Sequence, residues 1–268
     1  MKRYLPGILT LVIVVAFSAT VASADLMEGL VAYWPMDEGG GDMAADASGN
    51  GHDATLLAGA QWAAGAKVGS AAIEFDGTDG RLVAGTFDVV GGGITLAAWI
   101  KPDDFDVPDG RVISKSTDWG GNDHWWMLST IDANHVLRFR LKTDDGQDTT
   151  TLIASSGELV AGEWVHVAAS WDGSMMRLYK NGEEVGSTAK GGAAVATDAS
   201  VAVSIGNQYP DTPHPDLPFD GLMDDVVVYS RALSPNELNE LAAGELSSAA
   251  TVSATGKVAT TWAQLKQQ

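Results

Sequence analysis

A short loop of oxygen-bearing side chains is the part of the sequence with the most evident capacity for chemistry. Asp46, Ser48 and Asn50 place such side chains at alternate positions, and Gly51 permits a sharp turn directly after them. Oxygen ligands at every second residue can wrap around one calcium ion. Leu57 stands where such loops often have a closing glutamate, so a further carboxylate must come from elsewhere. The alternative is a plain Asx turn, in which Gly51 supplies a positive φ.

A second group of side chains could bind a sugar. Trp119, Asp123 and His124 lie in one glycine-containing segment, and Tyr209 lies in a later segment that contains four prolines. Flat aromatic rings stack on the C–H faces of sugars, and aspartate can hydrogen-bond their hydroxyl groups. We expect Trp119 and Tyr209 to be exposed. In the alternative interpretation the aromatic rings pack in the core, as strand alternation requires for one tryptophan of the pair at 125 and 126.

Catalysis would need a different arrangement, and few residues in the sequence suit it. Glu74 and Asp76 are two positions apart and would share one strand face, as the paired carboxylates of a glycoside hydrolase can. The next acid, Asp79, comes only after a turn. His166 lies inside an apolar strand pattern and is expected to be packed rather than to act as a base. No motif for a catalytic triad, a phosphate-binding loop or a Cys/His metal cluster is evident, so the sequence predicts a protein that is not an enzyme.

The N-terminus has the three parts of a secretory signal peptide. Lys2 and Arg3 precede an apolar run over residues 8–17, and Ala22-Ser23-Ala24 provides small residues for cleavage. The apolar run is shorter than the ~20 residues that a membrane-spanning helix needs. We predict cleavage after Ala24, a secreted or periplasmic location, and no membrane span once the signal is removed.

The composition limits the possible partners. The formal net charge of −19 at pH 7 disfavours nucleic acids and anionic membranes, because like charges repel. The same carboxylates could bind divalent cations, although a solvated acidic surface explains them equally well. Cysteine is absent, so an exported domain of this kind must be held together by its core, helped by a metal ion if one binds.

The elements that must position these residues are most evident between positions 163 and 185. Residues 164–171 read as a strand, and Asp172-Gly173 then offers a tight turn. Residues 176–180 read as a second strand, followed by Asn181-Gly182, a pair typical of a type I′ turn. Two short turns in close succession indicate antiparallel strands rather than a parallel sheet with crossover helices.

Strand patterns recur along the rest of the chain, with no internal repeat and no second domain. We expect the strand at 71–75 to pair with the one at 81–84. Ser234, Pro235 and Glu237 form a capping box for one short helix that reaches Ala243. Many short strands and one helix predict an all-β sandwich of two antiparallel sheets. The other expected strands cover residues 29–36, 54–57, 94–101, 111–116, 125–131, 136–143, 150–155, 201–206 and 222–230.

Five stretches together resemble one known family. They occur in the family's order and read GLVAYWPMDEGGGDMAADASGNGHDATL, AAIEFDG, ITLAAWIKP, GEWVHVAASWDGSMMRLYKNGEEV and FDGLMDDVVVYSRALSPNELNEL. The chain is thereby similar to the laminin-G-like, concanavalin A-like lectin and glucanase superfamily, which includes the pentraxins. The resemblance implies a jelly-roll domain over residues 25–244, between the signal peptide at 1–24 and a tail at 245–268.

The resemblance also implies how a metal site could be completed. The first and last strands lie close together in this family, so Asp220, Asp224 and Asp225 could meet the loop at Asp46, and members often hold calcium. We therefore predict one structural calcium ion. Its candidate ligands are Asp46, Ser48, Asn50, Asp220 and Asp224.

The residues and the resemblance together predict a non-catalytic recognition module, lectin-like or adhesive. Its favoured partner is a carbohydrate or a cell-surface glycan. One alternative is a glycoside hydrolase of the same fold, in which Glu74 and Asp76 would open onto a cleft. Another is a scaffold that binds a protein, which an exposed apolar sheet face would favour. The candidate ligand-binding residues are Trp119, Asp123, His124 and Tyr209.

Overall fold

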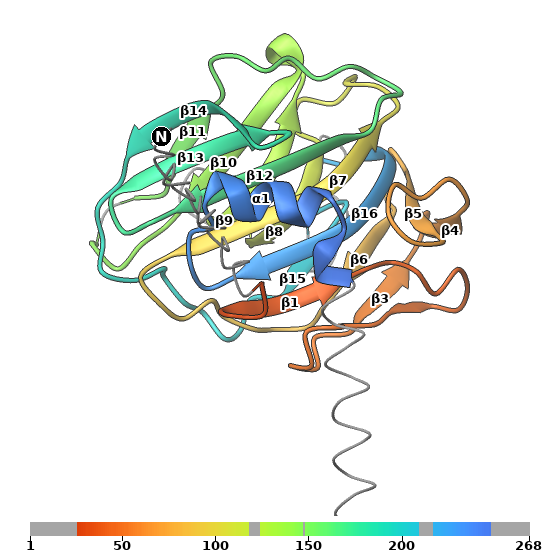
Figure 1. The fold of residues 1–268 in the computed structure, drawn as a ribbon, viewed down its shortest axis with the longest axis horizontal. Coiled ribbons are helices and arrows are strands. Elements are labelled where there is room, and N and C mark those ends of the chain that lie inside the picture. The colour runs from red at the N-terminus through yellow and green to blue at the C-terminus, as the bar shows by residue number, and fades with distance from the viewer. Residues whose placement is uncertain (1–25, 118–123, 147, 209–216, 248–268) are drawn as a thin grey trace, which may run out of the picture.

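The chain folds into two eight-stranded antiparallel sheets that pack face to face (Figure 1). The computed structural model describes residues 26–117, 124–146, 148–208 and 217–247. Sheet A contains, in spatial order, β14 (Glu183–Ala189), β13 (Met175–Lys180), β12 (Val165–Trp171), β7 (Ile94–Pro102), β16 (Asp220–Tyr229), β5 (Ala72–Asp76) and β4 (Gln61–Ala63), and β1 (Leu30–Trp34) also pairs with β16. Sheet B contains β11 (Thr150–Ile153), β10 (Val136–Leu141), β9 (His124–Ile131), β8 (Arg111–Ser116), β15 (Val203–Ile205), β6 (Arg81–Val83), β3 (Ala54–Leu57) and β2 (Met43–Ala44). The predicted all-β jelly-roll sandwich is confirmed.

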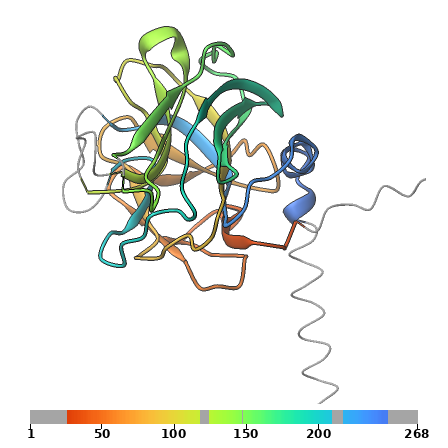
Figure 2. The ribbon, with the colours of Figure 1, turned by 90° about the vertical axis from the view of Figure 1, so that its left-hand side faces the viewer.

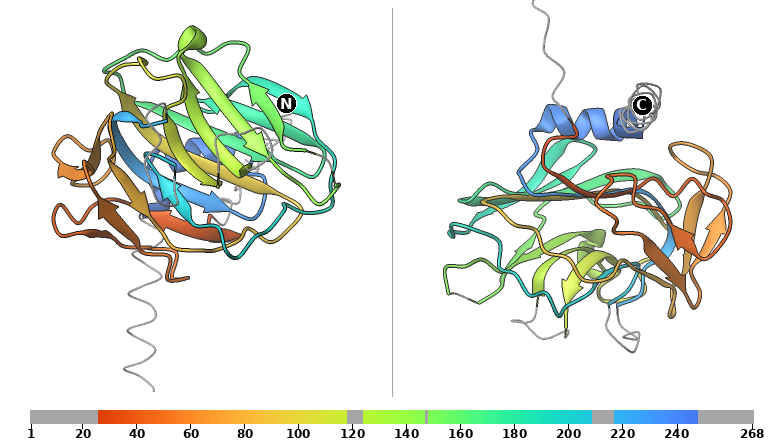
Figure 3. Two further views of the ribbon diagram at one scale, coloured as in Figure 1. Left: turned by 180° about the vertical axis from the view of Figure 1, so that it is seen from behind. Right: turned by 90° about the horizontal axis from the view of Figure 1, so that it is seen from below.

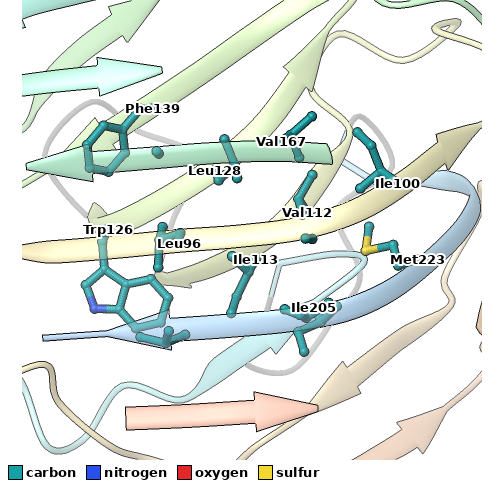
Figure 4. Close-up of a cluster of buried hydrophobic side chains, with 14 of the residues drawn as sticks. Leu96, Ile100, Val112, Ile113, Trp126, Leu128, Phe139, Val167, Ile205 and Met223 are labelled. Atoms are coloured by element: carbon teal, nitrogen blue, oxygen red, sulfur yellow. The ribbon is translucent and has the colours of Figure 1, made fainter. Parts of the chain in front are cut away.

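The core lies between the sheets, where both inner faces contribute large apolar side chains (Figure 4). In β10, Leu137, Phe139 and Leu141 are buried in this core, whereas Arg138 and Arg140 are half-buried. Successive side chains of a strand point to opposite faces. The alternation in β10 therefore places its two arginines on the face of sheet B that is turned away from the core.

The hairpins that begin at β12 follow the sequence prediction. Asn181 and Gly182 have φ values of 50° and 79°, and a type I′ turn requires positive φ at both positions. A Cβ atom on Gly182 would lie 2.1 Å from Oδ1 of Asn239, so only glycine fits this turn. At the preceding turn, Oδ1 of Asp172 accepts hydrogen bonds from the backbone N–H groups of Ser174 and Met175.

One helix, α1 (Pro235–Ala242), lies over the outer face of sheet A (Figure 3, right). The predicted capping box is present: Ser234 Oγ accepts a hydrogen bond from the N–H of Glu237 (3.3 Å), and Glu237 Oε2 accepts one from the N–H of Ser234 (2.7 Å). Leu238 and Leu241 are buried in a second apolar cluster with residues of β1, β7, β12, β13 and β16. The helix and sheet B therefore lie on opposite sides of sheet A (Figure 2).

The outer faces of the two sheets differ in how far helices cover them. Within the described residues, the other helical segments are a single 3₁₀ turn, η1 (Ala133–His135), which joins β9 to β10, and residues 245–247, which directly follow α1. No helix of the described chain lies over the outer face of sheet B, although Arg111, Met127 and Ser129 on that face are fully buried.

Two strand predictions differ from the structure. β5 and β6 do not pair with each other, because β5 lies in sheet A and β6 in sheet B. Asp76 explains the difference: its Oδ1 accepts hydrogen bonds from the N–H groups of Thr78, Asp79 and Gly80. The resulting turn carries the chain from one sheet to the other instead of reversing it within one. β2 and β4 were not predicted, since they have only two and three residues.

The predictions made for the two ends of the chain concern residues that the structure does not describe. The signal peptide at 1–24 and most of the tail at 245–268 lie outside the described residues. Within the described part of the chain, no helix is long and apolar enough to cross a membrane.

Candidate functional site

Three arginines gather on the outer face of sheet B. The strand register places Arg111 of β8 opposite Ser129 of β9, and Ser129 opposite Arg138 of β10. Arg140 follows two positions after Arg138 on the same face of β10. The three side chains and their contacts form what we call the arginine cluster: Asp109, Arg111, His124, Arg138, Arg140 and Gln208.

Asp109 is the carboxylate that joins two of these arginines. Its Oδ2 lies 3.1 Å from Nη2 of Arg111 and also forms an ion pair with Nη2 of Arg138. The Arg111 side chain is fully buried, whereas 15% of the Arg138 side chain is exposed. The ion pair of Arg111 is therefore buried, whereas that of Arg138 lies closer to solvent.

His124 and Gln208 hold the inner part of the cluster. Nη2 of Arg111 lies 3.1 Å from Nε2 of His124 and donates a hydrogen bond to Oε1 of Gln208 (3.2 Å). Nη1 of Arg140 lies 3.3 Å from both ring nitrogens of His124. His124 is fully buried between the two guanidinium groups, so its ring offers no stacking surface for a sugar.

The cluster is electropositive within a strongly acidic protein. Burial, together with the charge of Arg140, lowers the pKa of Arg111 to about 9 and that of Arg138 to about 10. Nε and Nη1 of Arg111 and Nε of Arg138 are buried without a hydrogen-bond partner. Buried N–H groups of this kind are costly unless something accepts from them. The cluster therefore holds buried N–H donors that no acceptor of the described chain satisfies.

An aromatic ring lies on the same face. Trp125 is half-buried at the start of β9, and its carbonyl accepts a hydrogen bond from the N–H of Lys142 directly after β10. Nζ of Lys142 lies 5.6 Å from the centre of the Trp125 ring. Side chains two positions apart on a strand lie on the same face. Trp125 therefore lies on the same face as Met127, and Lys142 lies on the same face as Arg140. The neighbouring Trp126 is fully buried, as the sequence requires of one member of this pair.

The loop at Asp46 is held by the protein's own hydrogen bonds. Its Oδ1 accepts from the N–H groups of Tyr33 and Ser48, and its Oδ2 accepts from the N–H of His52 and the hydroxyl of Ser48. These bonds lower the pKa of Asp46 although burial opposes them. The Asn50 amide donates to the carbonyl groups of Leu30 and Val31. The arrangement is that of an Asx turn fastened to β1.

The acids proposed to close the metal site lie elsewhere. β1 does pair with β16, as the resemblance implies. However, Asp224 is fully buried and its Oδ2 accepts from the N–H groups of Lys67 and Val68. Asp220 pairs in register with Asp76 at the beginning of β16. Within the described ranges, no group of three or more Asp, Glu, His or Cys side chains could hold a metal ion. The described residues therefore do not gather the five predicted ligands into one group, and the calcium ion stays a prediction.

Only one of the four predicted sugar-binding residues lies in the part of the chain that the structure describes. Trp119, Asp123 and Tyr209 lie outside the described residues, so their predicted role stays a prediction. His124 is described, and its buried position corrects the expectation that it borders an open sugar surface. The reason is electrostatic: the imidazole fills the space between two guanidinium groups that would otherwise face each other.

The carboxylates considered for hydrolysis serve the fold. The turn hydrogen bonds of Asp76 lower its pKa against the effect of burial, which is the opposite of what a catalytic acid needs. Oε2 of Glu74 accepts a hydrogen bond from Gln61 of the neighbouring strand. His166 is buried, and its ring lies 5.5 Å from that of Trp99, so the prediction that it is a packed residue is confirmed.

The sequence interpretation missed the arginine cluster. The signal was present in Val136–Leu141, where Arg138 and Arg140 alternate with apolar residues. Two cations on one strand face are conspicuous in a chain with so few basic residues. What the sequence could not indicate is the third arginine, because Arg111 comes from a separate strand and meets them only through sheet pairing.

The two packed antiparallel sheets define a jelly-roll class of β-sandwich. A laminin G profile described as the concanavalin A-like lectin/glucanases superfamily matches residues 76–239, more than half of the chain. The chain belongs to this superfamily.

Curated relatives match the chain over short parts of their length. It is 28% identical over 149 residues to adhesion G-protein coupled receptor V1 of Danio rerio, covering 55% of this chain and 2% of the receptor. It is 46% identical over 52 residues to pappalysin-1 of Mus musculus, covering 19% of this chain and 3% of pappalysin-1. The chain thus corresponds to a small module within much larger proteins.

Solved structures share the fold. The binding domain of Paraclostridial Mosquitocidal Protein 1 has a TM-score of 0.60 and 19% identity, covering 81% of this chain and 52% of that one. Domain 4 of the extracellular arabinanase AbnA from Geobacillus stearothermophilus, in complex with arabinotriose, has a TM-score of 0.56 and 23% identity, covering 80% and 98%. The botulinum neurotoxin serotype D ligand binding domain, in complex with N-acetylneuraminic acid, has a TM-score of 0.58 and 14% identity, covering 81% and 51%.

Proposed function

We propose that this protein is a non-catalytic recognition module that binds carbohydrate outside the cytoplasm. The observation that carries the proposal is the outer face of sheet B, where the strand register and alternation place the half-buried ring of Trp125 on the same face as the arginine cluster. Sugar sites commonly combine an aromatic platform with a few directed polar groups. Sheet A has no equivalent face, because α1 and its apolar cluster cover it.

The comparisons support a binding role of this kind. Two of the structures with this fold contain a bound sugar, arabinotriose in one and N-acetylneuraminic acid in the other. Both likenesses are below 25% identity and show the fold alone, so the choice of ligand has to come from this chain's own residues.

A protein-binding scaffold is less well supported. Such a role would favour a contiguous apolar patch on one face. The exposed large hydrophobic residues of the described chain come from four different segments, and one of them, Ile153, lies on the outer face of sheet B, opposite Arg138. These four residues are Met43, Val90, Ile153 and Val160.

Isothermal titration of the chain from Asp25 with a panel of neutral and acidic oligosaccharides tests the proposal. At least one sugar should bind, and Trp125→Ala should weaken it on the order of tenfold, since a stacked ring contributes about 1 kcal/mol. Trp62→Ala is the matched control, because Trp62 is a half-buried tryptophan on β4 of sheet A. Trp119→Ala would extend the test to the segment that the sequence analysis favours. If no sugar binds, or if both described variants weaken binding equally, the proposal is wrong.

The same samples test the non-catalytic part of the proposal. Mass spectrometry after prolonged incubation should find every bound oligosaccharide intact. Cleavage that Glu74→Gln abolishes would establish the alternative of a glycoside hydrolase. N-terminal sequencing of the exported protein tests the location, since export should leave a chain that begins at Asp25.

A further inference from the structure

We infer that β11, a free edge of sheet B, pairs with the same strand of a second copy of this chain. Three features of the strand point to this partner: it lacks the usual protection of an edge, it carries no charge, and its register allows it to pair with itself. The pairing does not require the proposed sugar site.

The other free edges of the two sheets are protected. A strand at an edge leaves one row of N–H and C=O groups unpaired, and proteins commonly cover, shorten or charge such edges. The loop at Asp46 covers β1, because Asp46 accepts from the N–H of Tyr33 and Ala47 donates to its carbonyl. β2 and β4 have only two and three residues. β14 begins with the exposed Glu183 and Glu184, and its pairing with β13 contains a register shift.

β11 has none of these protections. It has four residues and pairs with β10 without a shift in register. The strand contains neither a charged residue nor a proline, and residues 149–157 are all uncharged. Thr151 is exposed, and 50% of Ile153 is exposed. β11 lies at the end of sheet B beside β14 (Figure 1), and no strand of the described chain pairs with its other side.

The hydrogen bonds of β11 show which of its backbone groups face outward. The N–H of Ala154 donates to the carbonyl of Leu137 (2.9 Å). In an antiparallel pair, residues that exchange such bonds alternate with residues that do not, so Leu152 also bonds to β10. The N–H and C=O groups of Thr151 and Ile153 therefore point away from β10.

These outward groups allow the strand to pair with itself. A two-fold axis beside Leu152 places Thr151 opposite Ile153 of the second copy, and Ile153 opposite Thr151 of the second copy. Each pair can then exchange both of its backbone hydrogen bonds. Threonine and isoleucine are β-branched, and such side chains pack well across neighbouring strands.

Charge explains why two copies would meet at this edge. Chains with a net charge of −19 repel each other over most of their surface. The second copy brings the same uncharged segment to β11, so the contact places no like charges opposite each other. Residues 186–189 of β14 are also uncharged. The N–H of Ser155 donates to the carbonyl of Val185 (3.0 Å), which holds the chain after β11 against β14.

The pairing would affect recognition at a surface. A two-fold axis perpendicular to sheet B leaves the outer faces of both copies on the same side. If that face binds sugar as proposed above, the dimer presents two sites to one glycan-covered surface. Two linked sites bind such a surface more tightly than one site does.

Sedimentation equilibrium of the exported protein over a range of concentrations tests the pairing. The short strand predicts a dimer with a dissociation constant on the order of 100 μM, because small interfaces are generally weak. In hydrogen exchange followed by NMR, the N–H groups of Thr151 and Ile153 should exchange more slowly as the protein concentration rises. The N–H of Leu152 is bonded within one copy and serves as the internal reference.

Variants then locate the contact. Ile153→Lys should raise the dissociation constant at least about tenfold, since a lysine on an edge strand opposes pairing. Thr151→Pro should do the same, because proline removes the outward N–H and leaves the bonds to β10 in place. Val160→Lys is the matched control: Val160 is 51% exposed but lies outside the strands, so this variant should dimerise as the wild type does. Thermal melting shows that each variant is folded.

The outcomes that overturn the pairing are distinct. One is a protein that stays monomeric at millimolar concentration, even if an added extended peptide slows exchange at Thr151 and Ile153, because the edge would then bind a foreign strand. Another is a dimer that Ile153→Lys and Thr151→Pro leave intact, or that Val160→Lys dissociates equally. The proposed function stands in each case, because sugar binding to one copy does not need the dimer.

Discussion

Two buried carboxylates in the middle of β16 are the residues most sensitive to pH. Asp225 has φ of 50° at a bulge in the pairing of β16 with β7, and its Oδ1 accepts a 2.5 Å hydrogen bond from the hydroxyl of Tyr33. Asp224 is fully buried, and its Oδ1 has no hydrogen-bond partner. Burial is the main cause that raises the pKa of Asp224 to about 6 and that of Asp225 to about 7.

The direction of the pH dependence follows from these values. A carboxyl group with a raised folded-state pKa binds its proton more tightly in the folded protein than in the unfolded one. Its contribution to stability is complete below its unfolded pKa near 3.8 and is lost as the pH rises through about 6 to 7. Between pH 4 and pH 8 these two groups therefore make the protein less stable as the pH rises.

Asp224→Asn should flatten this dependence. The asparagine oxygen can still accept from Lys67 and Val68, and no charge has to be buried. We expect the fall in melting temperature from pH 5 to pH 8 to be smaller in the variant than in the wild type. Asp42→Asn removes one exposed carboxyl group and serves as the control for net charge. Identical slopes for Asp224→Asn and the wild type would show that Asp224 does not titrate in this range.

Asp46 allows a separate test of the calcium prediction. Its carboxylate accepts four hydrogen bonds from the protein, so Asp46→Ala should destabilise the fold by about 2–4 kcal/mol. We expect the same loss of melting temperature in calcium chloride and in EDTA, because the described residues gather no group of three or more metal-binding side chains around Asp46. Asp42→Ala in the same loop is the control. A wild-type melting temperature that falls in EDTA, with a smaller response in Asp46→Ala, would instead support the calcium site.

At the scale of elements, α1 covers the outer face of sheet A. Its apolar side covers sheet A, and a cavity of about 10 Å³ lined by Tyr33, His166, Asp225, Val227, Leu241 and Leu246 lies beneath it. This is about the room that one water molecule needs. The helix is therefore packed as part of the domain, and the proposed recognition face is the one on sheet B.

Leu238→Ala tests this view of α1. Leu238 is fully buried, and removing a buried leucine side chain costs about 2–5 kcal/mol. We expect a clear fall in the free energy of unfolding together with sugar affinity that stays close to that of the wild type. Asn236→Ala, on the exposed side of the helix, should change neither. A loss of sugar binding in folded Leu238→Ala would place the binding surface on sheet A.

Elements with local signals could be predicted from the sequence. The turn at Asn181-Gly182 and the capping box at Ser234 are both as expected, because each depends on residues close together in the chain. The pairing of β5 with β6 was wrong, because Asp76 turns the chain between sheets through bonds that the strand pattern does not contain. Sheet order depends on distant contacts and is harder to read from a single sequence.

At the scale of the whole molecule, the fold and the acidic character could be predicted from the sequence, whereas the proposed binding face could not. The sequence motifs pointed to Asp46 and Asp224 as metal ligands. In the structure, the carboxylate of Asp46 accepts hydrogen bonds from the chain itself, and Asp224 is fully buried. Arg111 and Arg138 are far apart in the chain and meet only through β9. A site built across three strands has no continuous sequence signature.

Hydrogen exchange with and without a bound sugar tests most directly whether sheet B is the recognition face. The measurement uses the chain from Asp25 and the oligosaccharide that binds most tightly in the titrations. We predict slower exchange at the edges and connections of β8, β9 and β10, with no change in α1 or in the loop at Asp46. Protection confined to α1 or to the Asp46 loop, or no protection at a saturating sugar concentration, would contradict recognition by the outer face of sheet B.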